Sequence, residues 1–325
     1  METQTDRRIA LPPPRYKVEQ TTVTRGSVVY HQYLVTEDNG KTHKFKGATS
    51  PLGVIAKDAL VKWSADKAAE DIGFALTARL GKKITLTEEW IAEVLEDARK
   101  APDKNKNDAA NIGSLAHEYI DQFIRGEAPE TIPEIIRPPI EAWQEWFRGS
   151  NLTIVAGETM VASLEYGFGG ELDFLAVDEE MAFVVGDWKS SNGIYVPHSL
   201  QAGGAYRQAF LETYGIECHR AVIVRFDKTE KHYGDYQGKE AYAEWAETKN
   251  GTGFVLRLCK GKRPLIYKAF PSVADIPGFK IIPERKKVGF EVKEVRDLKL
   301  SLKGFLLAKD LKENIDDEHF CPEAK

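Results

Sequence analysis

The most constraining feature of the sequence is a short apolar run that ends in two charged residues. Residues 181–186 read Met-Ala-Phe-Val-Val-Gly, and Asp187-Trp188-Lys189 follow directly. Both alternating faces of the run are apolar, and β-branched and aromatic residues are frequent in it, which is typical of a central strand covered on both sides. The sequence therefore predicts that Asp187 and Lys189 lie at the end of a buried strand.

A second predicted strand brings another carboxylate to the same place. Residues 172–177 form an apolar run that Asp178-Glu179-Glu180 separate from the next one, so the two runs predict a β-hairpin. Side chains two positions apart on a strand point to the same face. Asp187 and Lys189 therefore project together, and the partner strand can bring Asp173 beside them.

Such buried charges need partners, because an unpaired charge away from water costs on the order of several kcal/mol. A divalent cation between the carboxylates, with the lysine facing a phosphate or a nucleophilic water, would satisfy all three groups. An isolated Asp-x-Lys is more often an ordinary ion pair at the end of a surface hairpin, so neighbouring motifs have to supply the specificity.

Further motifs in the sequence supply the specificity that an isolated Asp-x-Lys lacks. Asp173 lies in a Gly-x-x-Asp pattern, Gln201 and Tyr206 follow in an expected helix, and His117 lies upstream in Gly-Ser-Leu-Ala-His-Glu. In this order the motifs resemble those of the PD-(D/E)xK nuclease superfamily, and its RecB-type branch is the most similar. That branch includes the RecB nuclease domain, the CRISPR-adaptation nucleases, many phage exonucleases and the mitochondrial genome maintenance exonuclease.

The resemblance covers roughly residues 45–220. It implies an α/β fold whose restriction-endonuclease-like core has a mixed central sheet flanked by helices, and it implies hydrolysis of DNA phosphodiester bonds with Mg²⁺ or Mn²⁺. The implied metal ligands are His117, Asp173, Asp187 and the backbone carbonyl of Trp188. The implied catalytic residues are Asp173 and Asp187, Lys189 for the water or the transition state, and Gln201 and Tyr206 for positioning the site or the DNA.

One departure from the family's pattern concerns Gln201 and Tyr206. The family usually has Gln-x-x-x-Tyr, whereas four residues separate the pair here, so the two side chains would not share a face of a regular helix. Either the helix begins irregularly at Gly203-Gly204, or only one of the pair keeps its role. The departure leaves open a DNA-binding recombination accessory protein with a decayed site, and a hydrolase of another phosphate ester is a second alternative.

The predicted organisation has three parts. Residues 1–50 form a tail and strands, residues 51–150 a helical lobe that carries the histidine motif, and residues 151–325 the nuclease core with a strand-poor insertion near 227–288. Within the lobe we expect helices at 52–69 and at 88–100, the latter with a capping box of Thr85 and Glu88, then a polar linker at 102–107. A strand is expected at 152–164, on which Glu158 is a weaker acidic candidate. A hairpin is expected within the insertion at 254–267.

Relatives of the RecB type often act from DNA ends. Because the helical lobe is available to cover the site, we expect an exonuclease that prefers free single-stranded ends and works with recombination or replication proteins. A net charge of −5 does not exclude DNA, because a local basic groove is enough.

The composition limits which cell compartment and which cofactors we expect for this protein. No apolar run reaches the ~20 residues of a membrane helix, and no signal peptide is apparent, so we expect no membrane partner and a cytoplasmic protein of a bacterial or phage-infected cell. Some RecB-type relatives hold an iron-sulfur cluster with four cysteines. The three cysteines of this chain, Cys218, Cys259 and Cys321, are too few and too far apart, so we expect no such cluster.

Overall fold

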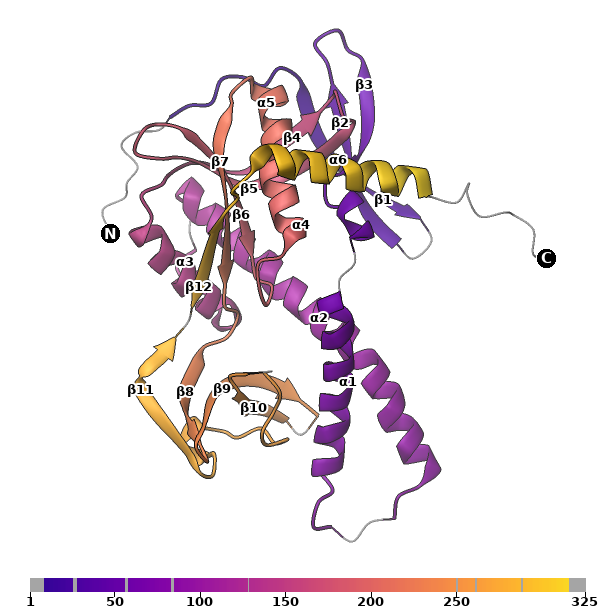
Figure 1. The fold of residues 1–325 in the computed structure, drawn as a ribbon, viewed down its shortest axis with the longest axis vertical. Coiled ribbons are helices and arrows are strands. Elements are labelled where there is room, and N and C mark those ends of the chain that lie inside the picture. Colours follow the sequence, from indigo (N-terminus) through magenta and orange to yellow (C-terminus); the bar gives the residue numbers. More distant parts are fainter. Residues whose placement is uncertain are drawn as a thin grey trace, which may run out of the picture.

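The computed structural model describes residues 9–25, 28–55, 58–82, 85–127, 129–249, 251–260, 262–287 and 289–315. Its largest element is a sheet of eight strands in the order β1-β2-β3-β5-β6-β7-β12, with β4 paired to β5 (Figure 1). The pairs β3–β5 and β6–β7 are parallel and the others antiparallel, so the sheet is mixed. The strands are β1 (Lys17–Arg25), β2 (Val28–Thr36), β3 (Thr42–Gly47), β4 (Thr153–Ser163), β5 (Phe168–Val177), β6 (Phe183–Lys189), β7 (Cys218–Phe226) and β12 (Phe290–Glu294).

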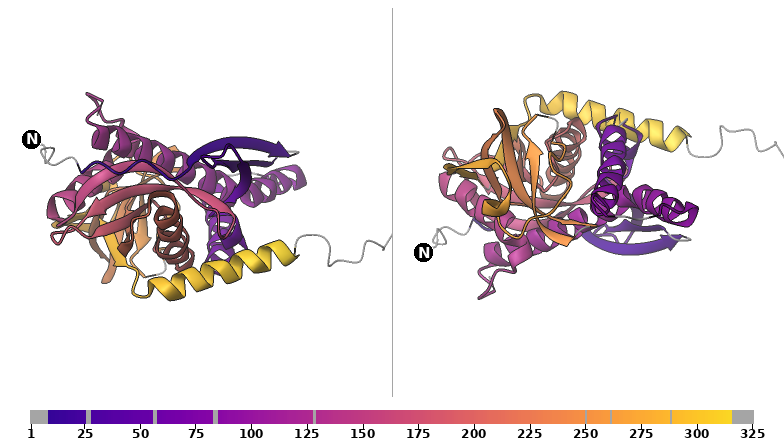
Figure 2. Two further views of the ribbon diagram at one scale, coloured as in Figure 1. Left: turned by 90° about the horizontal axis from the view of Figure 1, so that it is seen from above. Right: turned by 90° about the horizontal axis from the view of Figure 1, so that it is seen from below.

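Helices cover both faces of this sheet (Figures 1 and 2). They are α1 (Asp58–Thr77), α2 (Glu88–Arg125), α3 (Arg137–Gly149), α4 (Val196–Ser199), α5 (Arg207–Tyr214) and α6 (Leu298–Ile315), with the π-helical segment η3 (Leu200–Tyr206) and short 3₁₀ turns η1 (Pro51–Val54), η2 (Glu134–Ile136) and η4 (Val273–Asp275). One apolar core joins α2 and α3 to the sheet, and another joins η3, α5 and α6 to its opposite face. The predicted α/β class, with a mixed sheet flanked by helices, is confirmed.

Strand β6 lies inside the sheet, between β5 and β7, as its two apolar faces predict. Met181, however, lies in the preceding turn with a positive φ of 62°, so the strand begins at Phe183. On one face the Trp188 ring stacks on Phe174 with 3.8 Å between the ring centroids. Phe174 also covers Gly186, where an added Cβ would approach the ring to 1.8 Å. These contacts between Trp188, Phe174 and Gly186 hold the end of β6 in place within the sheet.

The helical lobe differs from the prediction in three respects. The first helix begins at Asp58 and runs to Thr77 instead of spanning 52–69. The second is capped by Thr87, whose hydroxyl accepts from Trp90 N, so the predicted capping box of Thr85 is wrong. The predicted linker at 102–107 is also wrong, because α2 continues through it as one helix of 38 residues.

The polarity of the 102–107 stretch has a different cause. It lies between two packed ends of α2, one that buries Val94 and Ala98 in the lobe and one that buries Ala116 and Tyr119 against the sheet. Residues 103–107 are exposed, and their polar character reflects contact with water and not a break in the helix.

The insertion is rich in strands, which corrects the prediction for 227–288. Its strands β8 (Lys231–Tyr236), β9 (Lys239–Thr248), β10 (Gly251–Leu258) and β11 (Phe279–Lys287) form a separate sheet in the order β10-β9-β8-β11. The predicted hairpin at 254–267 is present in part: β10 pairs with β9 along one edge, and antiparallel bridges on its other edge join Phe254 to Phe270 and Arg257 to Pro264. The misleading signal was the charge of these strands: one face buries small residues such as Ala241 and Ala243, while the other carries charged side chains.

Ion pairs hold this second sheet against the helical hairpin of α1 and α2. The guanidinium of Arg257, which is 4% exposed, binds both carboxylate oxygens of Glu70 at 2.7 and 3.1 Å. Lys249 lies 2.7 Å from Asp97 of α2. In Figure 1 the second sheet and the hairpin extend from the main sheet in the same direction, and these contacts join them.

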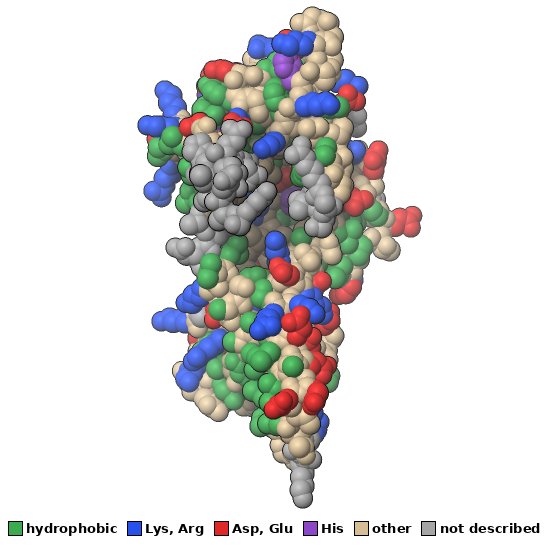
Figure 3. Space-filling model, turned by 90° about the vertical axis from the view of Figure 1, so that its right-hand side faces the viewer, with side chains coloured by type: hydrophobic (Ala, Val, Ile, Leu, Met, Phe, Trp, Pro, Cys, Tyr) green, Lys and Arg blue, Asp and Glu red, His purple; other side chains and the backbone are tan. Residues whose placement is uncertain are grey.

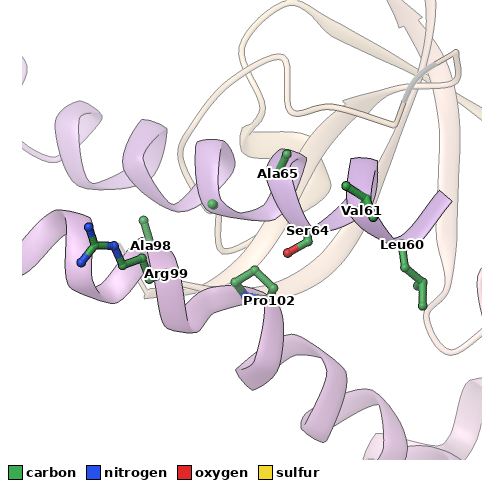
Figure 4. Close-up of a pocket in the computed structure, with 8 residues that line it drawn as sticks. Leu60, Val61, Ser64, Ala65, Ala98, Arg99 and Pro102 are labelled. Carbon is green, nitrogen blue, oxygen red and sulfur yellow. The ribbon is translucent and has the colours of Figure 1, made fainter. Parts of the chain in front are cut away.

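The outer surface of the α1–α2 hairpin is apolar in places. Hydrophobic side chains gather over the lower part of the face in Figure 3, and the exposed ones on this hairpin include Leu60, Val61 and Leu95. A shallow pocket between the two helices, drawn in Figure 4, is lined by Leu60, Val61, Ser64, Ala65, Ala68, Ala98, Arg99 and Pro102. None of the predicted site residues lines this pocket. No helix in the described ranges has both the length and the apolar character to cross a membrane.

Candidate active site

Two carboxylates and a lysine converge at the end of β6. Lys189 Nζ lies 2.6 Å from each carboxylate oxygen of Asp187 and 3.9 Å from Asp173 Oδ2. The backbone N–H of Trp188 donates to Asp173 Oδ2 at 2.7 Å, which ties β5 to β6 at this point. The side chain of Asp187 is fully buried, whereas those of Asp173 and Lys189 are 18% and 19% exposed.

Burial dominates the electrostatics of this group. It raises the pKa of Asp187 to about 6, although the positive charge of Lys189 acts in the opposite direction. It also raises the pKa of Asp173. For Lys189, burial acts to lower the pKa, but the two carboxylates outweigh it and raise the pKa, so the lysine stays an ammonium group.

His117 reaches the same place from α2. Its Nδ1 lies 3.7 Å from Asp173 Oδ1. Close approach of the helix depends on Gly113, one turn earlier, because a Cβ there would lie 2.6 Å from Ser190 Oγ just after β6. Burial, then the charge of Lys189, lowers the pKa of His117 to about 4. The imidazole is therefore neutral near pH 7, which is the form that binds metal ions.

The donor types at this place are those that a divalent cation takes in proteins. Asp187 Oδ2 is buried and within ionic distance of Lys189, yet it lacks a hydrogen bond of acceptable geometry. Asp173 Oδ1 faces the neutral imidazole of His117. Two carboxylates and one imidazole suit Mg²⁺ or Mn²⁺ with water or substrate as further ligands. Among the described residues, no group of three or more histidine, cysteine, aspartate or glutamate side chains is arranged to hold a metal ion.

The spacing of Gln201 and Tyr206 is explained by the helix that carries them. Residues Leu200–Tyr206 form a π-helical segment, in which residues five apart are neighbours. Gln201 Nε2 accordingly donates to Tyr206 Oη at 2.6 Å, and both side chains are buried. Of the two alternatives that the sequence left open, the irregular helix is the observed one.

Tyr206 also lies close to the carboxylates. Its pKa is raised well above the ordinary value by burial, with the charges of Asp173 and Asp187 adding to the effect, so the phenol keeps its proton. Gly170 of the Gly-x-x-Asp pattern makes room for the ring, because a Cβ there would lie 2.5 Å from Tyr206 Cε1. The structure thus brings together all five predicted catalytic side chains and the predicted histidine ligand.

Trp188 contributes in a different way from its neighbours. Its side chain is 2% exposed and lies in the core on the α3 side, next to Trp146 and Phe174. Its N–H orients Asp173, while the role of its carbonyl as a metal ligand stays a prediction.

Sequence reasoning missed part of an acidic cluster behind Asp173. The β4–β5 register sets Glu158 across from Asp173, since Gly157 pairs with Phe174 and Thr159 with Leu172. Glu171 is close enough for its charge to couple to both, and burial followed by these charges raises the pKa of Glu171 to about 7. Asp121 faces the same strands from α2, with Oδ1 buried and without a hydrogen bond. Both residues had a signal in the sequence, because Asp121 lies one turn after His117 and Glu171 lies two residues before Asp173 on the same strand, so each shares a face with a predicted site residue.

Other predicted features lie elsewhere. Cys218 is buried and Cys259 partly buried, both as free thiols, and Cys321 lies outside the described residues. The aromatic side chains of Tyr119, Trp143 and Trp146 are buried in the core between α2, α3 and the sheet.

Comparisons with models of known protein families and with curated proteins find no match to this sequence.

Proposed function

We propose that this protein is a metal-dependent deoxyribonuclease with a RecB-type PD-(D/E)xK core. The observation that carries the proposal is the convergence of six side chains from β5, β6, α2 and η3, namely Asp173, Asp187, Lys189, His117, Gln201 and Tyr206. A buried carboxylate pair with an ammonium group is expensive for folding alone, and hydrolysis of a phosphodiester gives it a use.

Each side chain has a role that its surroundings support. Asp173, Asp187 and His117 would hold Mg²⁺ or Mn²⁺, and such an ion, when bound, would acidify a water and neutralise charge on the phosphate. Lys189 is fixed as an ammonium group beside both carboxylates, so it can orient the nucleophilic water or stabilise the negative charge of the transition state. The Gln201–Tyr206 pair keeps a protonated phenol beside the carboxylates, where it can donate to the site or to the DNA.

Substitution at the carboxylates tests the proposal. Asp187→Asn and Lys189→Ala are each expected to lower cleavage of end-labelled DNA in Mg²⁺ or Mn²⁺ by on the order of a hundredfold or more. Glu179→Gln, in the exposed turn of the same hairpin, is the matched control and should cleave like the wild type. Wild-type cleavage by either site variant, at equal folded content by circular dichroism, would refute the assignment.

The mode of attack is part of the same proposal. We expect an exonuclease that prefers free single-stranded ends, because two arms, the α1–α2 hairpin and the second sheet, extend from the core and are joined by Arg257 and Lys249. Linear and circular single strands of equal sequence are the substrates to compare. Degradation of the circle at the rate of the linear strand would show that no free end is required.

The alternative of a decayed site loses its main support. It rested on the five-residue step from Gln201 to Tyr206, and in the π-helical segment this step is what brings the two groups into hydrogen-bond contact. A hydrolase of another phosphate ester is separated by competition, because DNA at low salt should inhibit a nuclease and leave such an enzyme unaffected.

A further inference from the structure

A group of cations gathers where the chain passes from the core into the second sheet. Strand β7 ends at Phe226 and β8 begins at Lys231, and the connection packs near α1. The four cations are Lys67 of α1, Arg225 of β7, Lys228 of the connection and Lys231 of β8. Three of their side chains are only 15% to 21% exposed, and Lys228 is also partly buried.

The carboxylates of this region are already engaged. Asp227 Oδ1 accepts from Arg225 and from Lys231, each at 2.9 Å. Glu70 binds Arg257 through both oxygens and lies 3.1 Å from Lys67. Glu244 lies 2.6 Å from Arg257 Nε and also accepts from the hydroxyl of Thr229.

Lys228 is left without such a partner. Within the described part of the chain it forms no hydrogen bond or ion pair, although it is partly buried. Burial, followed by the like charge of Arg225, lowers the pKa of Lys228; Glu244 acts in the opposite direction, and Lys67 adds a further lowering. A partly buried cation among other cations is unfavourable for folding, and an incoming anion would relieve this cost.

The position of Lys228 relative to the candidate active site suggests which anion. In the parallel register of β6 and β7, Arg225 pairs with Lys189, so both lie at the same end of neighbouring strands. Lys228 follows Arg225 by three residues, which corresponds to at most about 10 Å of chain. A polymer of phosphates that reaches Lys189 can therefore also reach Lys228.

We propose that Lys228, flanked by Lys67 and Arg225, binds a backbone phosphate of the nucleic-acid strand next to the one that is cleaved. This inference rests on the proposed nuclease function and adds a contact made by the connection between β7 and β8, where the chain enters the second sheet. The site joins three parts of the molecule, because Lys67 belongs to the helical lobe, Arg225 to the main sheet and Lys228 to the insertion.

Lys228→Met is the test, and Lys239→Met, at the exposed start of β9, is the matched control. Binding of a fluorescent single-stranded oligonucleotide is measured by anisotropy in chelator, so that no cleavage occurs, over a range of salt concentrations. Lys228→Met should bind on the order of tenfold more weakly, and its slope of log affinity against log salt should be shallower by about 0.7, the value for one lost phosphate contact on a single strand. Lys239→Met should match the wild type in both, and Lys228→Arg should retain binding.

A second readout separates a ligand contact from a structural role. Because Lys228 lacks a partner in the free protein, Lys228→Met should unfold at the same or a higher temperature than the wild type. Lower thermal stability in Lys228→Met, or an affinity and salt slope equal to those of the wild type, would overturn the phosphate site while the nuclease assignment stands. A wild-type protein that neither binds nor cleaves the strand would instead overturn the proposed function, and this site with it.

Discussion

The hydrogen bond between Gln201 and Tyr206 gives the sharpest test of the site, because it exists only if the chain is π-helical between them. The bond is 2.6 Å long and both side chains are at least nine-tenths buried, at 7% and 5% exposed. Tyr206→Phe removes the hydroxyl and leaves the amide of Gln201 without this acceptor. Such an unsatisfied buried group costs about 1–3 kcal/mol of the free energy of unfolding. Gln201→Met removes the other partner and should cost a similar amount.

A double-mutant cycle measures the bond itself. In Gln201→Met/Tyr206→Phe neither partner remains, so the double variant should lose less stability than the two single changes added together, by about 0.5–1.5 kcal/mol. Urea unfolding, followed by tryptophan fluorescence and circular dichroism, supplies the three values. Ser272 accepts a hydrogen bond from Ala274 N at the cap of η4, beside the separate core of the second sheet, so Ser272→Ala combined with Tyr206→Phe is the control and should be additive. Additivity of the Gln201 and Tyr206 changes within about 0.3 kcal/mol would show that the two groups do not meet, and the π-helical explanation of their spacing would be wrong.

Three further predictions concern the ion pair of Arg257 with Glu70, the glycine at position 170 and the metal ion. Arg257→Met should lower the free energy of unfolding by about 3–5 kcal/mol, since it leaves the Glu70 side chain, which is only 13% exposed, without its main partner. Hydrogen exchange should then quicken in β9 and β10. Burial acts to raise the pKa of Glu70, but Arg257 outweighs burial and the pKa is lowered overall. The stabilisation by this ion pair is therefore present above the unfolded-state pKa of about 4.3 and is lost as the pH falls through the folded-state pKa. In Glu70→Gln, the free energy of unfolding measured in urea should fall less steeply at acid pH. Gly170→Ala should destabilise the fold by about 1–3 kcal/mol by pressing on Tyr206, while Gly53→Ala, with no neighbour within 4 Å, should be silent in the same denaturation assay. Chelation should abolish DNA cleavage, and added Mg²⁺ or Mn²⁺ should restore it; cleavage that persists in chelator would contradict a metal-dependent reaction.

The strands and helices with clear apolar periodicity were predictable from the sequence. The predicted strand at 152–164 corresponds to β4, and the helical stretch that follows Gln201 and Tyr206 ends at Tyr214, with Gly215 as its C-cap in the left-handed region at φ 71°. The end of α2 at Gly126 follows the same rule. In these segments burial and backbone propensity favour the same secondary structure, so local sequence rules are enough to predict it.

The second sheet could not be predicted because its pattern is mixed. Its strands bury alanines and aromatic residues on one side and carry charged residues on the other, and several of those charges form ion pairs with the distant helices α1 and α2. A charged residue that is paired in the fold looks in the sequence like a solvated loop residue. The sequence also leaves open where Glu158 lies, because its position across from Asp173 depends on the register of β4 against β5.

The π-helical segment shows how a site can depend on an element that follows it by many residues. Gly203 and Gly204 weaken a helix by propensity, and local rules give no reason for them to occur in its middle. In the fold, α6 crosses at this point: a Cβ on Gly204 would lie 2.7 Å from the backbone oxygen of Ser301, and one on Gly203 would lie 2.7 Å from Val295. The glycines therefore allow the last helix to pack directly on the segment that aligns Gln201 with Tyr206. Since α6 belongs to the same apolar core as Tyr206, the geometry of the candidate active site is coupled to the docking of the C-terminal helix, and no spacing rule applied to residues 201–206 alone would have found it.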